Sequence, residues 1–443
     1  MAETLQQHLF EILGSLGSVH GVTQLFLWLF PFFLLLELPL NLLIVTGMMR
    51  WYTRQLAMTP QANRYQPRVT CIITCYSEGR GVHKTLETLC EQLYPGQIEL
   101  IPVVDGASAN HDTMQAVRDF RIDASLYPKR YLRPIAKWQR GGRVSSLNAG
   151  LQQATGDILL ALDGDTSFDN TMVDAMVRHF EDPDVPAVSG SLRVRNTWAS
   201  FVTLIQALEY FLSIQSSKVG LGEWNTVNNI SGAFGAFRTS FLRRIGGWDT
   251  HSAEDLDLTL RIKSYFGRKP LRIPFEPAAV GHTDVPETLR GFFKQRLRWD
   301  GDLFFLYIRK HRHSMTPRLL GWRNFLMTLA SGFVFQLMLP FLIVGYCLLG
   351  LVFLPVEAIL ALALVLYGLY FFVAMILYLA GLAMVSERPR ADLKLAIVMP
   401  VFPVFMFALR CWGVICTLNE IFRRGHEETT MAPWWVLKRG RRF

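Results

Sequence analysis

The chain has few cysteines, and none of them is placed as a metal ligand. Its six cysteines, among 443 residues, form no CxxC pair and have no histidine partner at zinc-site spacing. We therefore expect free thiols that pack as small apolar side chains in a reducing compartment. They are Cys71, Cys75, Cys90, Cys347, Cys411 and Cys416.

The first 21 residues contain no lysine or arginine, although the whole chain has a net charge of +9. The apolar run Val22–Met48 has no basic segment before it and is too long for the core of a signal peptide, so we expect a retained transmembrane helix. Arginines after this run place the N-terminus outside and the next segment in the cytoplasm. No RNA-binding signature is present, and we expect no nucleic acid partner.

Long apolar runs explain a hydrophobic content of 51%. Basic residues precede the first of three C-terminal runs and follow the second and the third, which predicts cytoplasmic ends there. The third run contains Pro400, Pro403 and Arg410, so we expect it to be re-entrant or interfacial, with a cytoplasmic C-terminus. A full span that violates the charge rule is the alternative. The runs are Asn324–Leu354, Ala358–Val385 and Leu395–Ile421.

Glu37 lies inside the first apolar run, between Leu36 and Leu38. An acid at membrane depth is by default a functional candidate. The alternative is a neutral glutamate that caps a kink at the neighbouring prolines.

Residues 67–284 alternate between short apolar, β-rich runs and helical stretches, which predicts an α/β domain with a parallel sheet. Ligands bind beyond the carboxyl ends of the strands in such sheets, so the residues after each strand are the first candidates. The expected strands are Val69–Thr74, Ile98–Val104 and Ile158–Leu162, and the expected helices include Gly81–Gln92 and Arg143–Gln153.

Asp163-Gly164-Asp165 follows the last of these strands. Two carboxylates one residue apart can reach one hard cation, and Mg²⁺ usually sits on one or two carboxylates plus substrate phosphates. The alternative is an ordinary turn, since Asp and Gly are common at strand ends. Gly141-Gly142-Arg143 begins a helix, where backbone N–H groups and the helix dipole favour an anion such as a diphosphate.

The ends of the other two strands carry groups that could bind a base. Tyr76 could stack on it, while Glu78 and Asp105 could accept hydrogen bonds from its N–H groups. Each segment alone is also compatible with a turn.

Two later segments complete the set of candidates. Glu254-Asp255 begins a helix, and we expect Asp255, supported by Glu254, to take a proton from an acceptor hydroxyl; Asp257 is expected to be structural. In Gln295-Arg296-Leu297-Arg298-Trp299, polar groups can grip phosphate and the Trp299 face can carry a sugar ring. The alternative for Trp299 is a membrane-interface anchor.

Taken in order, these segments resemble the processive, membrane-embedded family 2 glycosyltransferases, which include cellulose, hyaluronan, chitin-oligomer and poly-N-acetylglucosamine synthases. Pro286–Trp299 and Ser231–Phe234 are most similar to the bacterial poly-N-acetylglucosamine synthases. The resemblance covers roughly Arg68–Arg309 and the layout of apolar runs. It implies a cytoplasmic GT-A domain, with a Rossmann-like, mixed, mostly parallel sheet, joined to transmembrane and interfacial helices.

The resemblance also implies a role for each matching residue. Nucleotide-sugar contacts would come from Tyr76, Glu78, Asp105, Arg143, Asp163, Asp165, Gln295 and Arg298. A Mg²⁺ or Mn²⁺ ion would bind at Asp163 and Asp165. Asp255 and Glu254 would be the catalytic pair, and the acceptor would meet Trp299, Gly232 and Phe234.

Three departures from the family pattern stand out. The family usually has lysine where Arg143 stands. The arginine keeps the positive charge but changes the geometry of the contacts that the side chain can make. Asp105 is followed by Gly106-Ala107-Ser108 rather than the commoner Asp-Gly-Ser. Residues 429–440 resemble only loosely the gating loops that cover the nucleotide in relatives.

We expect four regions: a transmembrane helix and linker over residues 1–64, the GT-A domain over 65–285, interfacial amphipathic helices over 286–320, and further transmembrane or interfacial helices with a cytoplasmic tail over 321–443. The expected function is inverting polymerisation of a β-linked polysaccharide from a UDP-sugar, with UDP-N-acetylglucosamine favoured by resemblance, and its translocation across a bacterial inner membrane. The few spans suggest that a small membrane partner or a second copy completes the channel.

Two alternatives remain open. A non-processive enzyme that glycosylates a lipid would need no Gln-x-x-Arg-Trp platform. A membrane scaffold or receptor with a dead transferase domain is opposed by the intact Asp163, Asp165 and Asp255.

Overall fold

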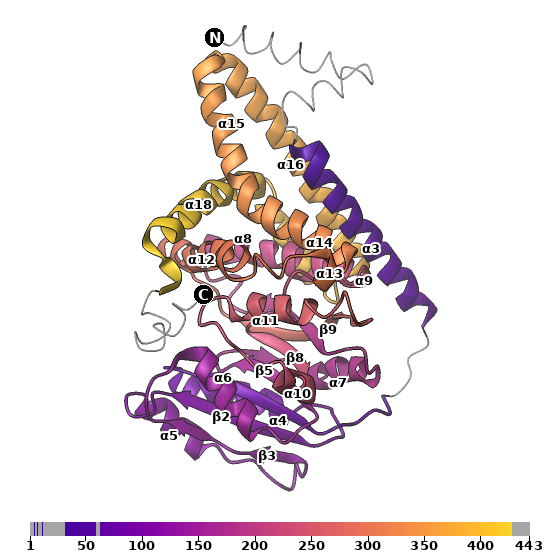
Figure 1. The fold of residues 1–443 in the computed structure, drawn as a ribbon, viewed down its shortest axis with the longest axis vertical. Helices are drawn as coiled ribbons and strands as arrows, with labels where there is room; N and C mark the ends of the chain where they lie inside the picture. The colour runs from indigo at the N-terminus through magenta and orange to yellow at the C-terminus, as the bar shows by residue number, and fades with distance from the viewer. Residues whose placement is uncertain (1–3, 5–6, 8–10, 12–31, 59–62, 428–443) are drawn as a thin grey trace.

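The computed structural model describes residues 4, 7, 11, 32–58 and 63–427. A mixed β-sheet with helices on both faces forms one end of the molecule, and long apolar helices extend from the other (Figure 1). A layer of shorter helices, among them α8 (Phe201–Tyr210) and α12 (Leu289–Phe304), lies between the two.

The sheet has nine strands in the order β3-β2-β1-β5-β8-β7-β9-β6, with β4 paired to β2. β1 is parallel to both β2 and β5, whereas β8 is antiparallel to both β5 and β7. The expected mixed, mostly parallel α/β sheet is therefore confirmed. The strands are β1 Val69–Cys75, β2 Ile98–Asp105, β3 Arg130–Leu132, β4 Ile135–Lys137, β5 Ile158–Asp163, β6 Ser167–Phe168, β7 Ala187–Val194, β8 Phe234–Arg238 and β9 Phe275–Thr283.

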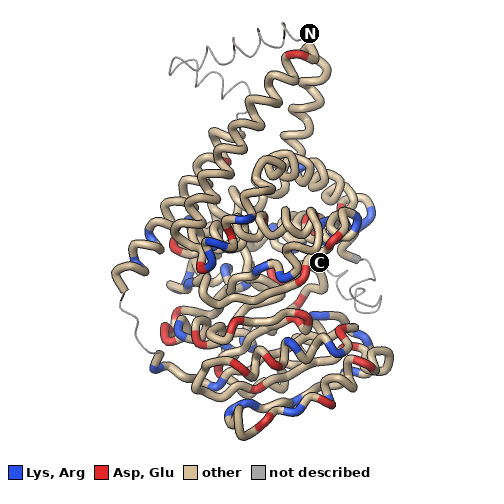
Figure 2. The backbone as a smooth tube through the Cα atoms, turned by 180° about the vertical axis from the view of Figure 1, so that it is seen from behind, with Lys and Arg blue, Asp and Glu red and all other residues tan. Residues whose placement is uncertain are grey.

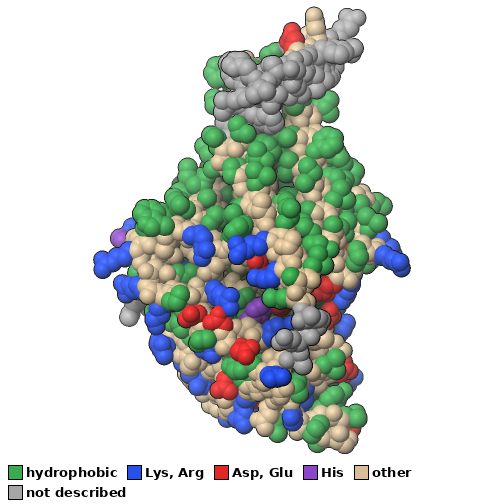
Figure 3. Space-filling model, turned by 90° about the vertical axis from the view of Figure 1, so that its right-hand side faces the viewer, with side chains coloured by type: hydrophobic (Ala, Val, Ile, Leu, Met, Phe, Trp, Pro, Cys, Tyr) green, Lys and Arg blue, Asp and Glu red, His purple; other side chains and the backbone are tan. Residues whose placement is uncertain are grey.

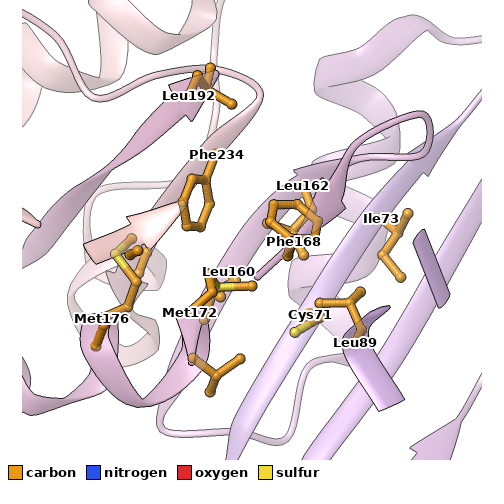
Figure 4. Close-up of a cluster of buried hydrophobic side chains, with 14 of the residues drawn as sticks. Cys71, Ile73, Leu89, Leu160, Leu162, Phe168, Met172, Met176, Leu192 and Phe234 are labelled. Atoms are coloured by element: carbon orange, nitrogen blue, oxygen red, sulfur yellow. The ribbon is translucent and has the colours of Figure 1, made fainter. Parts of the chain in front are cut away.

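Alternating side chains of the central strands build two hydrophobic layers, because successive residues of a strand point to opposite faces. Cys71 and Ile73 of β1 point to one layer, with Leu160 and Leu162 of β5 (Figure 4). Ile72 points to the other. The helices that supply side chains to the first layer include α4 (Val82–Cys90), α5 (His111–Asp119) and α7 (Met172–Val177), and those of the second include α6 (Gly142–Gln153), α10 (Thr239–Arg244) and α11 (Glu254–Lys263).

Four helices within the described residues are long and apolar enough to cross a membrane: Phe33–Ala57, Trp322–Phe353, Val356–Met384 and Phe402–Arg423. Charged residues are sparse along the upper helices and dense around the sheet (Figure 2). On the face in Figure 3, hydrophobic side chains cover the upper part, and lysine and arginine side chains gather just below them. This pattern is typical of a membrane-embedded segment with its basic flank.

Two of these four long helices combine α-helical and π-helical pieces, and the other two are α-helical throughout. The four comprise η1 (Phe33–Glu37) with α3 (Leu38–Ala57), α14 (Trp322–Met327) with η6 (Thr328–Met338) and α15 (Leu339–Phe353), α16 (Val356–Met384), and α18 (Phe402–Arg423). The remaining elements are η2 (Gly79–Gly81), η3 (Arg178–Glu181), η4 (Phe211–Ser216), α9 (Ser217–Glu223), η5 (Phe305–Lys310), α13 (Pro317–Leu320), α17 (Pro389–Asp392), η7 (Leu393–Val398) and η8 (Gly425–Glu427).

Helix α18, the core of the third C-terminal apolar run, lies obliquely to α15 and α16 (Figure 1). It packs along α12. The element that precedes it, η7, packs against α8, and the element that follows it, η8, packs against α12. Both ends of α18 therefore lie against the layer of short helices that adjoins the sheet domain. This arrangement favours the re-entrant or interfacial prediction over a full span, and the orientation of the chain in a membrane stays a prediction.

Glu37 makes a contact that neither sequence-based alternative names. Its side chain makes no capping hydrogen bond to α3, so the cap hypothesis is wrong. One carboxylate oxygen instead lies 4.0 Å from Arg410 of α18. A buried acid between apolar helices is thereby neutralised by a basic partner, as such groups usually are.

The six cysteines are free thiols, as expected. Cys71, Cys75, Cys90 and Cys416 are buried, whereas Cys347 in α15 is exposed. The expectation of burial within the protein therefore fails for Cys347, which lies on the outer surface of a helix long and apolar enough to cross a membrane.

Candidate active site

The carboxyl ends of three parallel strands meet at one edge of the sheet. Cys75 is paired with Val104, and Thr74 is paired with Asp163. Tyr76, Glu78, Asp105 and Asp163 therefore follow or end neighbouring strands, as the sequence predicted. Gly232 reaches the same edge, because Phe234 at the start of antiparallel β8 pairs with the residue before Asp163.

Arg143, in the first turn of α6, joins the separate parts of this edge. Its guanidinium contacts the carboxylate of Asp163 and lies 2.6 Å from Oε1 of Glu254. It also donates to Thr74 Oγ1 at 3.0 Å and to the carbonyl of Gly232. One arginine thus holds together the end of β5, the start of α11 and the loop before β8. Arginine can do this because its planar fork offers several donors in fixed directions.

The helix start at Gly141-Gly142 does bind an anion, but the anion is Asp105. The Asp105 Oδ1 atom accepts hydrogen bonds from Lys137 Nζ at 2.6 Å and from Gly141 N at 2.8 Å, and Oδ2 accepts from Gly142 N at 2.8 Å. The diphosphate expected at these two N–H groups would therefore have to displace a buried carboxylate. The structure leaves the Arg143 side chain as the phosphate-binding candidate of this segment.

Tyr76 and Glu78 differ in how freely they could meet a base. The Tyr76 ring is 46% exposed, and the Arg140 guanidinium lies 4.6 Å from its centre, so an arginine covers the face that a base would use. Glu78 is partly buried; burial raises its pKa, and the charge of Asp165 raises it further. Its Oε2 atom is buried and finds no hydrogen-bond partner in the described part of the chain.

Asp163 and Asp165 lie at the same turn but differ in exposure. Asp165 is exposed, whereas Asp163 is partly buried and accepts a hydrogen bond from Thr74 Oγ1 at 3.2 Å. No group of three or more potential ligand residues lies together in residues 32–58 and 63–427. Two carboxylates without a third protein ligand suit a Mg²⁺-type ion whose shell is completed by water and substrate phosphates.

Asp255 is held by uncharged donors in the first turn of α11. Its Oδ2 atom accepts from Asn229 Nδ2 at 3.1 Å and from Gly232 N at 3.2 Å, and its Oδ1 accepts from Leu256 N at 2.7 Å. Lys218 is buried behind it; burial lowers the Lys218 pKa to about 8, against the opposite effect of the Asp255 charge. The carboxylate is thus fixed in direction without a direct salt bridge among the described residues.

Glu254 and Asp257, on either side of Asp255, have opposite surroundings. Burial raises the pKa of Glu254, Arg143 lowers it, and the Asp255 charge raises it. For Asp257, the cost of burial is exceeded by the His311 hydrogen bond and the charges of Lys310 and Arg261, which bring the pKa to about 2. Asp257 therefore fits the structural role expected for it.

Helix α12 presents two faces to its surroundings. Gln295, Arg298 and Asp302 have the i, i+3 and i+7 spacing of one face. Asp302 lies close enough to Glu254, at the start of α11, for the charge of that glutamate to raise its pKa, which burial already raises. The Oε1 atom of Gln295 is buried and finds no partner in the described residues. This face therefore turns towards the sheet edge. On it, the Gln295 carbonyl oxygen is available to accept a hydrogen bond from a ligand.

The other face of α12 carries Arg296, which sequence reasoning left without a role. Its guanidinium lies 2.6 Å from Glu209 of α8 and 4.8 Å from the centre of the Trp299 ring. Trp299 is 41% exposed, so part of its ring is open while the arginine fixes its orientation. A sugar platform and an interface anchor are both compatible with this exposure, so its role stays a prediction.

The prediction that Phe234 meets an acceptor is wrong. Its side chain is 0% exposed in the described structure and packs 5.3 Å, centre to centre, from the ring of Phe168 (Figure 4). Successive side chains of a strand point to opposite faces of the sheet. The side chain of Phe234 is on the face that packs into the core. Gly232, two residues earlier, remains at the edge: a Cβ there would lie 3.3 Å from Glu254 Oε1.

Sequence reasoning missed several polar residues at this edge. Thr74, Lys137, Lys218, Asn229 and Asp302 each contact or adjoin a predicted residue. Thr74 alone carried a usable signal, because it is the penultimate residue of the strand before Tyr76.

Residues 67–301 match the model of the family described as glycosyltransferase-like family 2. Among curated proteins, a poly-β-1,6-N-acetyl-D-glucosamine synthase of Staphylococcus epidermidis is 31% identical over 233 residues, which are 52% of this chain and 53% of that protein. The synthase of the same name from Staphylococcus aureus strain COL is 32% identical over 235 residues, again 52% and 53%. The chain thus matches about half the length of these relatives.

A solved structure shows the same fold. A mannosyltransferase from Pyrobaculum calidifontis, in complex with GDP-Man and Mn²⁺, superposes with a TM-score of 0.52 at 21% identity and covers 87% of this chain and 99% of its own.

Proposed function

Because this chain belongs to glycosyltransferase-like family 2, we propose that it polymerises N-acetylglucosamine from UDP-N-acetylglucosamine into a β-linked polysaccharide and passes the product across the membrane. The matching half of the Staphylococcus synthases supports the polymer and the sugar. One observation carries the proposal for this chain: Arg143 draws Asp163 and Glu254 together at the sheet edge, with Asp255 beside them.

In the proposed reaction, an acceptor hydroxyl oxygen forms a bond to the anomeric carbon of the donor. The bond from that carbon to the diphosphate oxygen breaks, and UDP leaves with the electron pair. The proton of the hydroxyl passes to the Asp255 carboxylate, which three hydrogen bonds hold in a fixed direction. A single displacement inverts the configuration, so an α-linked donor gives a β-linkage.

The charge at this edge supports a requirement for Mg²⁺ or Mn²⁺ at Asp163 and Asp165. Five acids lie at the edge (Glu78, Asp163, Asp165, Glu254 and Asp255), and among the described residues Arg143 is the cation in contact with two of them. A diphosphate would add further negative charge. A bound divalent ion would offset it and stabilise the charge that develops on the leaving group.

The remaining binding roles follow from position. The diphosphate would be bound from the α12 face that turns to the edge, by Gln295 and Arg298. The uridine would be held by Tyr76, Glu78 and Asp105. The acceptor would contact Trp299 and Gly232. The tail beyond residue 427, with its loosely matching gating segment, lies outside the described residues.

The decisive experiment uses the purified full-length protein with UDP-N-acetylglucosamine and Mn²⁺. We expect UDP release together with long chains that contain only N-acetylglucosamine. Single additions to a lipid would instead support the non-processive alternative, and no UDP release from any UDP-sugar would contradict transferase activity. Omission of the divalent ion should reduce UDP release strongly.

A further inference from the structure

Lys218 of α9 is a buried basic residue close to the proposed base, and the reaction outlined above gives it no role. It is 5% exposed, and within residues 32–58 and 63–427 its amine makes one hydrogen bond, a donation to the main-chain carbonyl of Asn229 at 3.0 Å. Because a buried amine is costly without a partner, this hydrogen bond ties the position of Asn229 to that of Lys218.

Asn229 leads directly to the base. Its Nδ2 atom donates to Asp255 Oδ2 at 3.1 Å, and the N–H of Gly232, in the same loop before β8, donates to the same oxygen at 3.2 Å. The remaining hydrogen bond to this carboxylate, from Leu256 N, comes from α11 itself. The direction of the Asp255 carboxylate therefore depends on where the loop that contains Asn229 and Gly232 lies.

Helix α9 is fixed to the first apolar helix, α3. The two backbones cross in direct contact, because a Cβ added to Gly47 would overlap the carbonyl of Gly220, and one added to Gly220 would overlap that of Ile44. Just after α9, Trp224 Nε1 donates to the carbonyl of Leu43 at 3.0 Å. The Lys218 amine thus reaches the loop from a helix that cannot move towards α3 without a backbone clash.

We propose that Lys218 is a positioning residue for the transfer reaction: it holds the main chain of Asn229 so that the Asn229 side chain directs the Asp255 carboxylate. This inference rests on the proposed function, in which Asp255 is the base. Lys218 does not touch the substrate in this scheme, and its effect passes through Asn229. It also links the base, through α9, to the first apolar helix. Loss of the Lys218 hydrogen bond should slow the transfer step and leave donor binding unchanged, since a misplaced catalytic group costs rate.

The test measures kcat and donor KM for UDP release by the full-length protein with UDP-N-acetylglucosamine and Mn²⁺. Lys218→Met keeps a side chain of similar length without the donor or the charge. Its kcat should fall about tenfold or more, while its donor KM changes less than about twofold. A purely structural role would lower the melting temperature without this division between kcat and KM.

A double-mutant cycle identifies the route of the effect. Asn229→Ala removes the side-chain donor to Asp255 and should itself lower kcat. In the Asn229→Ala background, Lys218→Met should cost less than about a further twofold, because the two residues act in series. A further loss of about tenfold in that background would show that Lys218 acts without Asn229, and this would overturn the inference.

The matched control is Lys263→Met, at a lysine of α11 that is 2% exposed and lies about 12 Å along the helix from Asp255. Because distant sites act independently, its kcat should stay within about twofold of the wild-type value. Full kcat of Lys218→Met would overturn the inference, and so would an equal fall in the control. If Lys218→Met does not fold, Lys218→Leu takes its place in the same cycle. A wild-type protein that releases no UDP with any UDP-sugar would instead overturn the proposed function, and this inference with it.

Discussion

Two arginine-centred clusters organise the charged groups of this protein in opposite ways. At the sheet edge, Arg143 contacts two carboxylates, those of Asp163 and Glu254. Among the apolar helices, Arg410 forms one salt bridge within the described residues, to Glu37 at 4.0 Å. It also donates to the carbonyl of Phe335 at 2.8 Å and lies over the Phe335 ring. The first cluster has more acids than bases in contact, whereas the second is balanced.

The difference indicates that the Arg143 cluster binds ligands, whereas the Arg410 cluster holds helices together. A buried excess of carboxylates is costly unless a further cation or ligand joins it, so the Arg143 cluster is suited to a divalent ion and a diphosphate. A balanced pair between apolar helices needs no further partner, and this one joins η1, η6 and α18. We therefore expect substitutions in the first cluster to act on transfer and those in the second to act on stability.

The largest expected effect is that of Asp255→Asn. The substitution keeps the shape of the side chain but removes the proton acceptor, so transfer should fall about 10²-fold or more. UDP binding should persist, because Asp255 is held by Asn229 and backbone N–H groups rather than by the nucleotide-binding residues. Residual turnover above about a tenth of the wild-type rate would remove Asp255 as the base.

Replacement of each arginine by methionine tests the comparison directly. Arg143→Met leaves Glu254 buried without its cation, so it should destabilise the protein by about 3 kcal/mol and abolish donor binding. Arg410→Met should destabilise by a similar amount through Glu37, while the folded fraction keeps its donor KM. Thermal unfolding in detergent, paired with UDP-sugar titration, checks both. Loss of donor binding in Arg410→Met with normal stability would contradict the distinction.

The sequence predicted the parallel part of the fold well, because its strands are continuous apolar runs that end in polar residues. The later strands were missed, because β6 has only two residues and β7 pairs in parallel with β9 across a register shift at Gly190–Ser191. These pairings depend on contacts between distant segments, which local patterns do not carry.

For the candidate site, the sequence predicted which residues take part but not which of them contact one another. The glycine pair before Arg143 indicated an anion, but only the fold identifies Asp105, more than thirty positions earlier, as that anion. Phe234 was placed at the acceptor because Ser231–Phe234 resembles the matching segment of the family, but the direction of its side chain in β8 turns it into the core. Asp302 gave no signal, since an acid in an amphipathic helix ordinarily faces water.

Trp299→Ala should reduce chain elongation about tenfold while hydrolysis of the UDP-sugar changes less, because base or sugar stacking on an aromatic face contributes about 1–2 kcal/mol. The separate measurement of UDP release and product length distinguishes the two effects. An equal loss of both would favour the membrane-anchor interpretation, and Trp322→Ala, another exposed tryptophan at the start of α14, provides the matched control.

The smallest expected effect on transfer is that of Asp257→Asn. Asp257 lies on the same helix as Asp255, but its charge is offset by the basic residues that contact it. Its side chain is 0% exposed, and His311, Lys310 and Arg261 hold its pKa at about 2, below the ordinary value of 3.8. A lowered pKa stabilises the folded state above the unfolded value, so the wild type should exceed the variant by about 2 kcal/mol at neutral pH. This advantage should disappear as the pH falls from about 4 to about 2, which melting curves across that range would show. A stability difference that does not depend on pH, or a loss of transfer at neutral pH in the folded variant, would place Asp257 in the site cluster instead.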